Sequence, residues 1–123
     1  MKSFSVSWKS SSNPKKQRKY RHNAPLHVKQ HFMAVHLSKE LRAKHKTRAV
    51  QVRKGDVVTV MRGKFKKHSG KVERVDLKKG KVFLSGLELT KKDGTKSFVS
   101  VEPSNLLLTE IGAEDKKRKI KQK

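Results

Sequence analysis

GDVVTVMRGKFKKHSGKVERVD, residues 55–76, is the stretch that decides how the chain folds. An apolar, β-branched run at 57–61 leads into a basic turn without any acid, and a second extended run follows at 71–75. This order of strand, turn and strand predicts a hairpin. Like charges crowded on one loop repel each other, so we expect a polyanion to neutralise the tip of this hairpin.

The chain as a whole is strongly basic. It carries 33 Lys and Arg against 10 Asp and Glu on 123 residues, a net charge of +23. Residues 1–48 have a net charge of +12, residues 49–112 of +7 and residues 113–123 of +4. This distribution predicts a compact module with basic arms. Such a field attracts nucleic acid or an acidic membrane surface without choosing between them.

The composition also limits where the protein works. The absence of cysteine excludes disulfides and thiolate metal sites, and it is compatible with a reducing cytosol. No run approaches the roughly 20 apolar residues of a membrane span. The first eight residues lack the apolar region of a signal peptide. We therefore expect a soluble, cytoplasmic protein without membrane insertion.

From Val50 onward, short β segments alternate with turns, which predicts a mainly β module, a small barrel or a sandwich. Lys78-Lys79-Gly80 and Lys92-Asp93-Gly94-Thr95 are expected turns, and Pro103 is expected to interrupt the sheet before the last strand. The expected strands are 50–52 leading into 57–61, then 71–75, 82–84, 96–101 and 106–109. The expected core residues are Val58, Val60, Val72, Val75, Val82, Leu84, Val99, Val101 and Leu107.

Four parts are predicted along the chain. Residues 1–22 form a basic flexible arm that orders against a partner, because its apolar surface is too small to offset chain entropy. Residues 23–48 form short helices, with Asn23 and Ser38 as caps and Pro25 in a first turn. Residues 49–112 form the β module, and residues 113–123 form a basic tail.

The sequence contains few patterns typical of metal binding or catalysis. His27 and His31 have helical spacing, but cysteine is missing and Glu40 is the only acid nearby, so surface or RNA-facing imidazoles are favoured over a metal. The scattered acids are expected to pair with lysines. The glycines form neither a Walker nor a Rossmann pattern. We expect neither an enzyme nor a bound cofactor.

Two glycines flank the basic turn and give it a special character. Gly63 and Gly70 allow tight or positive-φ backbone and a close approach of phosphate. The turn's lysines and Arg62 supply charge-assisted donors to phosphate oxygens. Phe65 is either an apolar anchor or a platform for base stacking, and we favour the anchor. The basic run 15–22, with Tyr20 embedded, favours an RNA-contacting arm over a solvated tail.

Several motifs of the chain resemble those of a known family. Residues 53–63 and 68–72 are similar to a KOW motif, a strand–loop–strand element of small SH3-like barrels in ribosomal and transcription proteins. Further similarities over about residues 15–118 resemble the archaeal and eukaryotic branch of universal large-subunit ribosomal protein twenty-four, which is numbered twenty-six in eukaryotes. They lie at 17–19, 23–26, 37–42 and 103–105. The short C-terminus resembles the archaeal members.

The resemblance implies an SH3-like KOW barrel with short N-terminal helices and basic extensions, on the large subunit near the exit of the peptide tunnel. Its implied partners are the 5′ part of large-subunit ribosomal RNA, bound early in assembly, neighbouring ribosomal proteins, and factors that dock at the tunnel exit. The alternative is a transcription-elongation KOW factor that contacts polymerase. Sedimentation with ribosome-sized particles would favour the first reading, and sedimentation with polymerase complexes the second.

The predicted RNA contacts combine the motif with the basic arm. The resemblance also carries one departure, because Lys67 stands where the family pattern has a glycine. If that position needs a positive φ, the lysine costs on the order of 1 kcal/mol. The motif residues are Arg53, Lys54, Arg62, Gly63, Lys64, Lys66, Lys67, His68, Gly70 and Lys71. The other predicted contacts are Lys15, Lys16, Arg18, Lys19 and Arg21 in the arm, Arg48, and Lys91 and Lys92 in a projecting hairpin.

Overall fold

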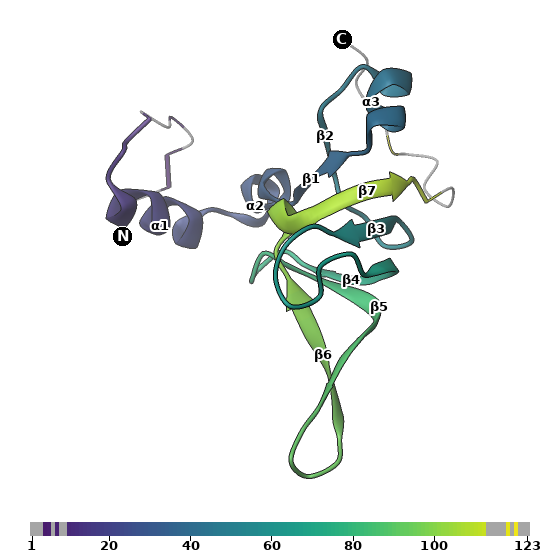
Figure 1. Ribbon diagram of the computed structural model, residues 1–123. Helices are drawn as coiled ribbons and strands as arrows, with labels where there is room; N and C mark the ends of the chain where they lie inside the picture. The colour runs from purple at the N-terminus through teal and green to yellow at the C-terminus, as the bar shows by residue number, and fades with distance from the viewer. Residues whose placement is uncertain (1–3, 6, 8–9, 113–117, 119, 121–123) are drawn as a thin grey trace.

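A computed structural model describes residues 4–5, 7, 10–112, 118 and 120. Seven strands form one sheet in the order β2-β1-β7-β3-β4-β5-β6, and Figure 1 shows this sheet curling on itself. The prediction of a mainly β, small barrel-like fold is confirmed. The strands are β1 (Ala34–Leu37), β2 (Ala49–Gln51), β3 (Val57–Val60), β4 (Ser69–Asp76), β5 (Lys81–Thr90), β6 (Lys96–Val101) and β7 (Leu106–Glu110).

Three short helices come from the N-terminal part of the chain: α1 (Pro14–Asn23), α2 (Leu26–Phe32) and α3 (Lys39–His45). In Figure 1, α1 extends away from the sheet and α2 connects it to the barrel. A 3-10 turn at Pro103–Asn105 precedes β7, where the proline was expected to interrupt the sheet. Within the described residues, every helix is too short or too polar to cross a lipid bilayer.

The ends of these helices follow from local chemistry. The Ser38 hydroxyl accepts from the Leu41 backbone N–H at 3.4 Å, which confirms it as the cap of α3. The Asn13 side chain caps α1, so residues 14–23 are helical where a flexible arm was expected. Asn23 ends this helix instead of starting the next one. Pro25 takes the cap position of α2 without a side-chain hydrogen bond.

The strand β1 was not predicted. The apolar residues from Leu26 to Val35 suggested continued helix, but α2 ends at Phe32. Alternate residues of β1 are buried, and the strand pairs antiparallel with β2 and parallel with β7. A parallel partner from the other end of the chain leaves no trace in local periodicity, which explains the error.

The core confirms most of the predicted positions. Val75 and Val99 are half-buried against the core. The prediction of Leu107 as a core residue is wrong, because its neighbours Leu106 and Leu108 are the buried residues of this strand. A one-residue change of register exchanges the two faces of a strand. The buried apolar cluster consists of Met33, Val35, Leu37, Val52, Val58, Val60, Val72, Val82, Leu84, Leu87, Val101, Leu106 and Leu108.

The strands β5 and β6 continue beyond the barrel as a long hairpin, which projects downward in Figure 1. Its tip is the expected turn: the Lys91 N–H donates to the Thr95 carbonyl at 2.7 Å, and Gly94 has a φ of +86°. The Asp93 carboxylate accepts from the Thr95 hydroxyl at 2.7 Å and from its N–H at 3.0 Å. These bonds lower the pKa of Asp93 and give the projecting tip a fixed shape.

Candidate nucleic-acid interface

The loop that joins β3 to β4, residues 61–68, has a defined backbone. The Lys67 N–H donates to the Val60 carbonyl at 2.8 Å, and the Val60 N–H donates to the His68 carbonyl at 2.9 Å. Inside the loop, the His68 N–H donates to the Phe65 carbonyl at 3.0 Å. The backbone of the tip is therefore fixed before any ligand binds, so less conformational entropy is lost on binding.

The side chain of Phe65 also holds this loop, on the side that faces the core. Its half-buried side chain packs against the core cluster, which confirms the anchor reading over the stacking platform. The Lys64 ammonium lies 5.9 Å from the centre of the Phe65 ring, within reach of a cation–π contact. One aromatic side chain therefore holds the loop on the barrel and orients a neighbouring cation.

The backbone at the tip is strained at one position. Lys67 has a φ of +71°, in the left-handed region that a glycine adopts at little cost. Gly63 has a φ of +92° and open space around it. The loop therefore keeps the positive-φ conformation at residue 67, although the side chain there is lysine. The strain accompanies an additional positive charge at the tip.

The loop presents its charge to solvent. The side chains of Arg62, Lys64, Lys66 and Lys67 are exposed, as is that of Lys71 on β4. In the described part of the chain, the ion pairs involve cations elsewhere: Arg74, Lys81, Lys96 and Arg118. Five exposed cations without an acid in the loop form a surface suited to phosphate groups.

His68 and Gly70 make contacts within the protein, and their predicted role in RNA binding stays a prediction. The half-buried His68 ring has Nε2 3.2 Å from the Ser85 carbonyl oxygen, and it also packs beside Gly86. A Cβ on Gly70 would lie 2.8 Å from the same carbonyl. Gly70 does not have the positive φ that was expected as one reason for a glycine there. The observed reason is the short distance to the Ser85 backbone, which leaves no room for a Cβ. Both residues shape the loop from behind its cationic surface.

The other predicted motif residues do not gather at the loop. Arg53 and the exposed Lys54 lie in the turn before β3, whereas the loop follows β3, so the two groups are at opposite ends of this strand. Exposed Arg48 precedes β2. Lys91 and Lys92 are exposed at the tip of the β5–β6 hairpin. The predicted contacts thus form several separate cationic surfaces, and their role in RNA binding stays a prediction.

Helix α1 carries the cations of the basic arm. Lys15, Arg18 and Lys19 have the i, i+3 and i+4 spacing of a shared face, and the helix contains no acid. Lys16 and Arg21 are also exposed. Like charges at this spacing destabilise a helix by about 0.2–0.5 kcal/mol per pair, a cost that a bound polyanion would remove.

Aromatic contacts hold α1 in place. The Tyr20 ring lies 5.1 Å from the Phe4 ring and 6.1 Å from the Phe32 ring, between centroids. The Arg21 guanidinium lies 5.7 Å from the centre of the Phe32 ring. Tyr20 therefore packs within the protein, and its contact with Phe32 attaches α1 to α2.

A buried ion pair, which the sequence did not reveal, lies below the turn before β3. Asp56 is fully buried, and Oδ1 lies 2.6 Å from Nη1 of Arg118. Asp56 also accepts from the N–H groups of Arg53 and Gly112, and Arg118 donates to the Gln51 carbonyl at 2.7 Å. Asp56 was expected to pair with surface lysines. Instead it holds part of the tail against the barrel.

The predicted basic tail, 113–123, otherwise lies outside the described residues, which include only Arg118 and Ile120 of it. Among the described residues, His, Asp and Glu nowhere gather in a group of three that could hold a metal ion. His31 instead lies with Nδ1 3.2 Å from the amide nitrogen of Gln51.

Comparison with known proteins gives the family. Residues 11–123 match the family of ribosomal proteins L26 of eukaryotes and L24p of archaea. A relative named large ribosomal subunit protein uL24, from Methanosphaera stadtmanae, is 46% identical over 108 residues, which cover 88% of this chain and 92% of that protein. Its counterpart from Methanosarcina barkeri is 44% identical over 108 residues, 88% of this chain and 93% of that protein. The chain therefore belongs to the uL24 family of ribosomal proteins, and to its archaeal type.

Proposed function

We propose that the protein is a structural constituent of the large ribosomal subunit and that it binds the ribosomal RNA of that subunit. The observation that carries the proposal is the β3–β4 loop, in which a fixed backbone presents exposed cations without any acid. Membership of the uL24 family supports a ribosomal partner over the polymerase partner of a transcription factor. The role is architectural, without a catalytic step.

The proposed mechanism is electrostatic clamping. The β3–β4 loop meets RNA as a rigid surface, because its backbone hydrogen bonds and Phe65 already hold it. Helix α1 adds a second row of cations, which the bound phosphates relieve of mutual repulsion. Were about eight phosphates neutralised, the slope of log affinity against log salt would be about −5 to −7. A slope near zero would refute this mechanism.

The finer assignments rest on the family resemblance. We infer binding to the 5′ part of the large-subunit RNA early in assembly, at a position near the exit of the peptide tunnel. The projecting β5–β6 hairpin, with Lys91 and Lys92 at its tip, is the element that would reach furthest from the barrel. Neighbouring ribosomal proteins and factors docking at the tunnel exit are the proposed protein partners.

Crosslinking in cells, followed by sequencing of the attached RNA, tests the proposal. We expect the crosslinks to concentrate in one region of the large-subunit RNA, with peptides from the β3–β4 loop and α1 at the protein side. Crosslinks spread over messenger RNA would overturn the ribosomal assignment. Sedimentation of the endogenous protein with polymerase instead of ribosome-sized particles would do the same.

A further inference from the structure

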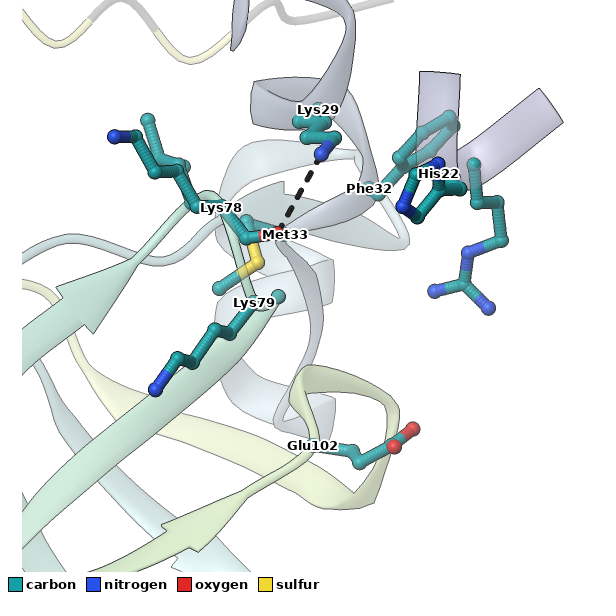
Figure 2. A pocket seen from close by; sticks show the side chains of 10 residues that line it. His22, Lys29, Phe32, Met33, Lys78, Lys79 and Glu102 are labelled. Carbon is teal, nitrogen blue, oxygen red and sulfur yellow. Dashed lines mark hydrogen bonds between the residues drawn. The ribbon is translucent and has the colours of Figure 1, made fainter. Parts of the chain in front are cut away.

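A second basic surface lies at the other end of β4 from the β3–β4 loop. It is a groove of about 290 Å³ between the end of α1, α2 and the β4–β5 turn. Eight residues of β4 separate the two sites, a span of about 25 Å. Figure 2 shows Lys78 and Lys79 on one side of this basic groove, His22 and Phe32 on the other, and Met33 between them.

The walls of the basic groove are cationic. Arg21, Lys29, Lys78 and Lys79 line it together with His22, and Glu102 is the only acid. That carboxylate is already engaged, because its Oε1 accepts from the Lys81 ammonium at 2.7 Å. This hydrogen bond and the charge of Lys81 lower the pKa of Glu102, and the charge of Arg21 contributes to the shift.

The mutual repulsion of these cations is only partly relieved within the protein. The Lys29 ammonium reaches the Lys78 carbonyl at 3.5 Å, the dashed line in Figure 2, which brings it close to the lysines of the turn. Lys78 and Lys79 are exposed, and their long flexible stems allow their ammonium groups to turn toward a ligand. An anion between the helices and the turn would neutralise this crowding.

The floor of the basic groove has a different chemistry. Met33 is 1% exposed and closes the bottom of the groove, and the half-buried Leu77 beside it adds apolar surface. Phe32 adds a half-buried aromatic ring beside them. Cations around an apolar, aromatic floor suit a ligand with a phosphate attached to a flat ring, as in a nucleotide.

We propose that the basic groove binds one unpaired nucleotide of a single-stranded RNA segment, with its phosphate on the lysines and its base against Phe32. The volume is at the small end of ligand sites, which suits one nucleotide. A paired duplex keeps its bases stacked inside, so it cannot fill the apolar floor. An acidic peptide would satisfy the cations but would leave Phe32 unused. The inference rests on the proposed RNA-binding function and adds a second site to it.

Binding of the full chain to two fluorescent probes tests the phosphate part. The probes are a short single-stranded RNA and an RNA duplex of equal charge. Replacing Lys78 and Lys79 together by Gln should weaken single-strand binding by at least about fivefold, because charge-assisted hydrogen bonds are lost. The matched control replaces Lys39 and Lys44, both exposed on α3, and should stay within about twofold. Equal losses in both double variants would overturn the proposal.

The base part is tested with Phe32→Leu, which keeps apolar volume and removes the aromatic face. We expect a loss of about 5- to 100-fold on the single strand and a smaller loss on the duplex, because Phe32 also holds the cationic helix α1 through Tyr20 and Arg21. Equal effects on the two probes, or none, would overturn the proposal. So would polyglutamate that binds with the same dependence on Lys78, Lys79 and Phe32, because it would identify an acidic-peptide site.

A loop variant separates this inference from the proposed function. Replacing Lys64 and Lys66 by Gln should weaken both probes, since the β3–β4 loop meets phosphate without reading bases. If the loop variant loses affinity while the groove variants match the control, only the basic groove is refuted. If the unmodified protein binds neither probe, the proposed function fails as well.

Discussion

Lys67 offers the sharpest test of the β3–β4 loop, because its backbone strain and its charge can be removed separately. Lys67→Gly removes both. Lys67→Ala removes the charge but keeps a Cβ, and with it the cost of a φ of +71°. The two variants have the same net charge, so the difference between them excludes the effect of the charge and depends on the backbone.

The expected difference follows from the backbone. A residue with a Cβ costs roughly 1–2 kcal/mol in the left-handed region. Glycine avoids this cost, but the larger entropy of its unfolded chain lowers the free energy of unfolding by about 0.4–1 kcal/mol. The hydrogen bond from the Lys67 N–H to Val60, at 2.8 Å, prevents the loop from relaxing to a negative φ. We therefore expect the Gly variant to be more stable than the Ala variant by about 1 kcal/mol.

Thermal unfolding followed by circular dichroism measures this difference. A gain of about 1 kcal/mol corresponds to a melting temperature about 3–5 °C higher for a protein of this size. If Lys67 contacts one phosphate, the slope of log affinity for RNA against log salt should become shallower by about 0.7–0.9. This change should be the same in both variants. A Gly variant that melts at or below the Ala variant would refute the strain. Different salt slopes in the two variants would refute the separation of strain from charge.

Three further predictions concern stability. Gly70→Ala should lower the free energy of unfolding by about 1–3 kcal/mol, because its Cβ would lie 2.8 Å from a backbone carbonyl on β5; an unchanged denaturation midpoint would contradict this close approach. Arg118→Met should cost about 3–5 kcal/mol, because it leaves the buried Asp56 carboxylate unpaired, and a loss below about 0.5 kcal/mol in urea would show that the ion pair does not hold the tail. Glu102→Gln should cost less than about 1 kcal/mol at neutral pH, since the carboxylate that pairs with Lys81 is largely exposed. The pKa of Glu102 in the folded protein lies below the ordinary value of 4.5, so its contribution to stability is present above that pH and is lost as pH falls through the folded pKa; a difference from the unmodified protein that persists in acid would refute this origin.

The parts of the fold that could be predicted are those with local causes. β3 and β4 follow from β-branched runs around a polar turn, and the cap of α3 follows from one serine. The parallel pairing of β1 with β7 has no such cause. Four residues of strand gain their conformation from a partner near the other end of the chain, which periodicity does not record. The register error at Leu107 has the same origin.

The candidate site divides in the same way. The charge of the β3–β4 loop and the anchor Phe65 could be predicted, because each is a property of a short segment. The unusual Lys67 followed instead from the family pattern, which has a glycine at that position. The Asp56–Arg118 pair could not, since 62 positions separate the two residues and its burial depends on tertiary packing. The basic groove also escaped prediction, because four separate segments of the chain contribute its lining and only Arg21 lay in the predicted set.

The pairing of β1 with β7 also determines when the barrel can form during synthesis. His36 pairs with Leu107, a residue made about 70 positions later, and β3 waits for the same strand. Until β7 has been synthesised, β1 lacks its parallel partner, and its inward side chains are not buried. Helix α1, in contrast, depends on aromatic contacts within the first part of the chain. Closing so long a loop is entropically costly and slows folding. The nascent protein therefore passes through a stage in which its cationic helix precedes its core, and a chain that stops before β7 should not fold.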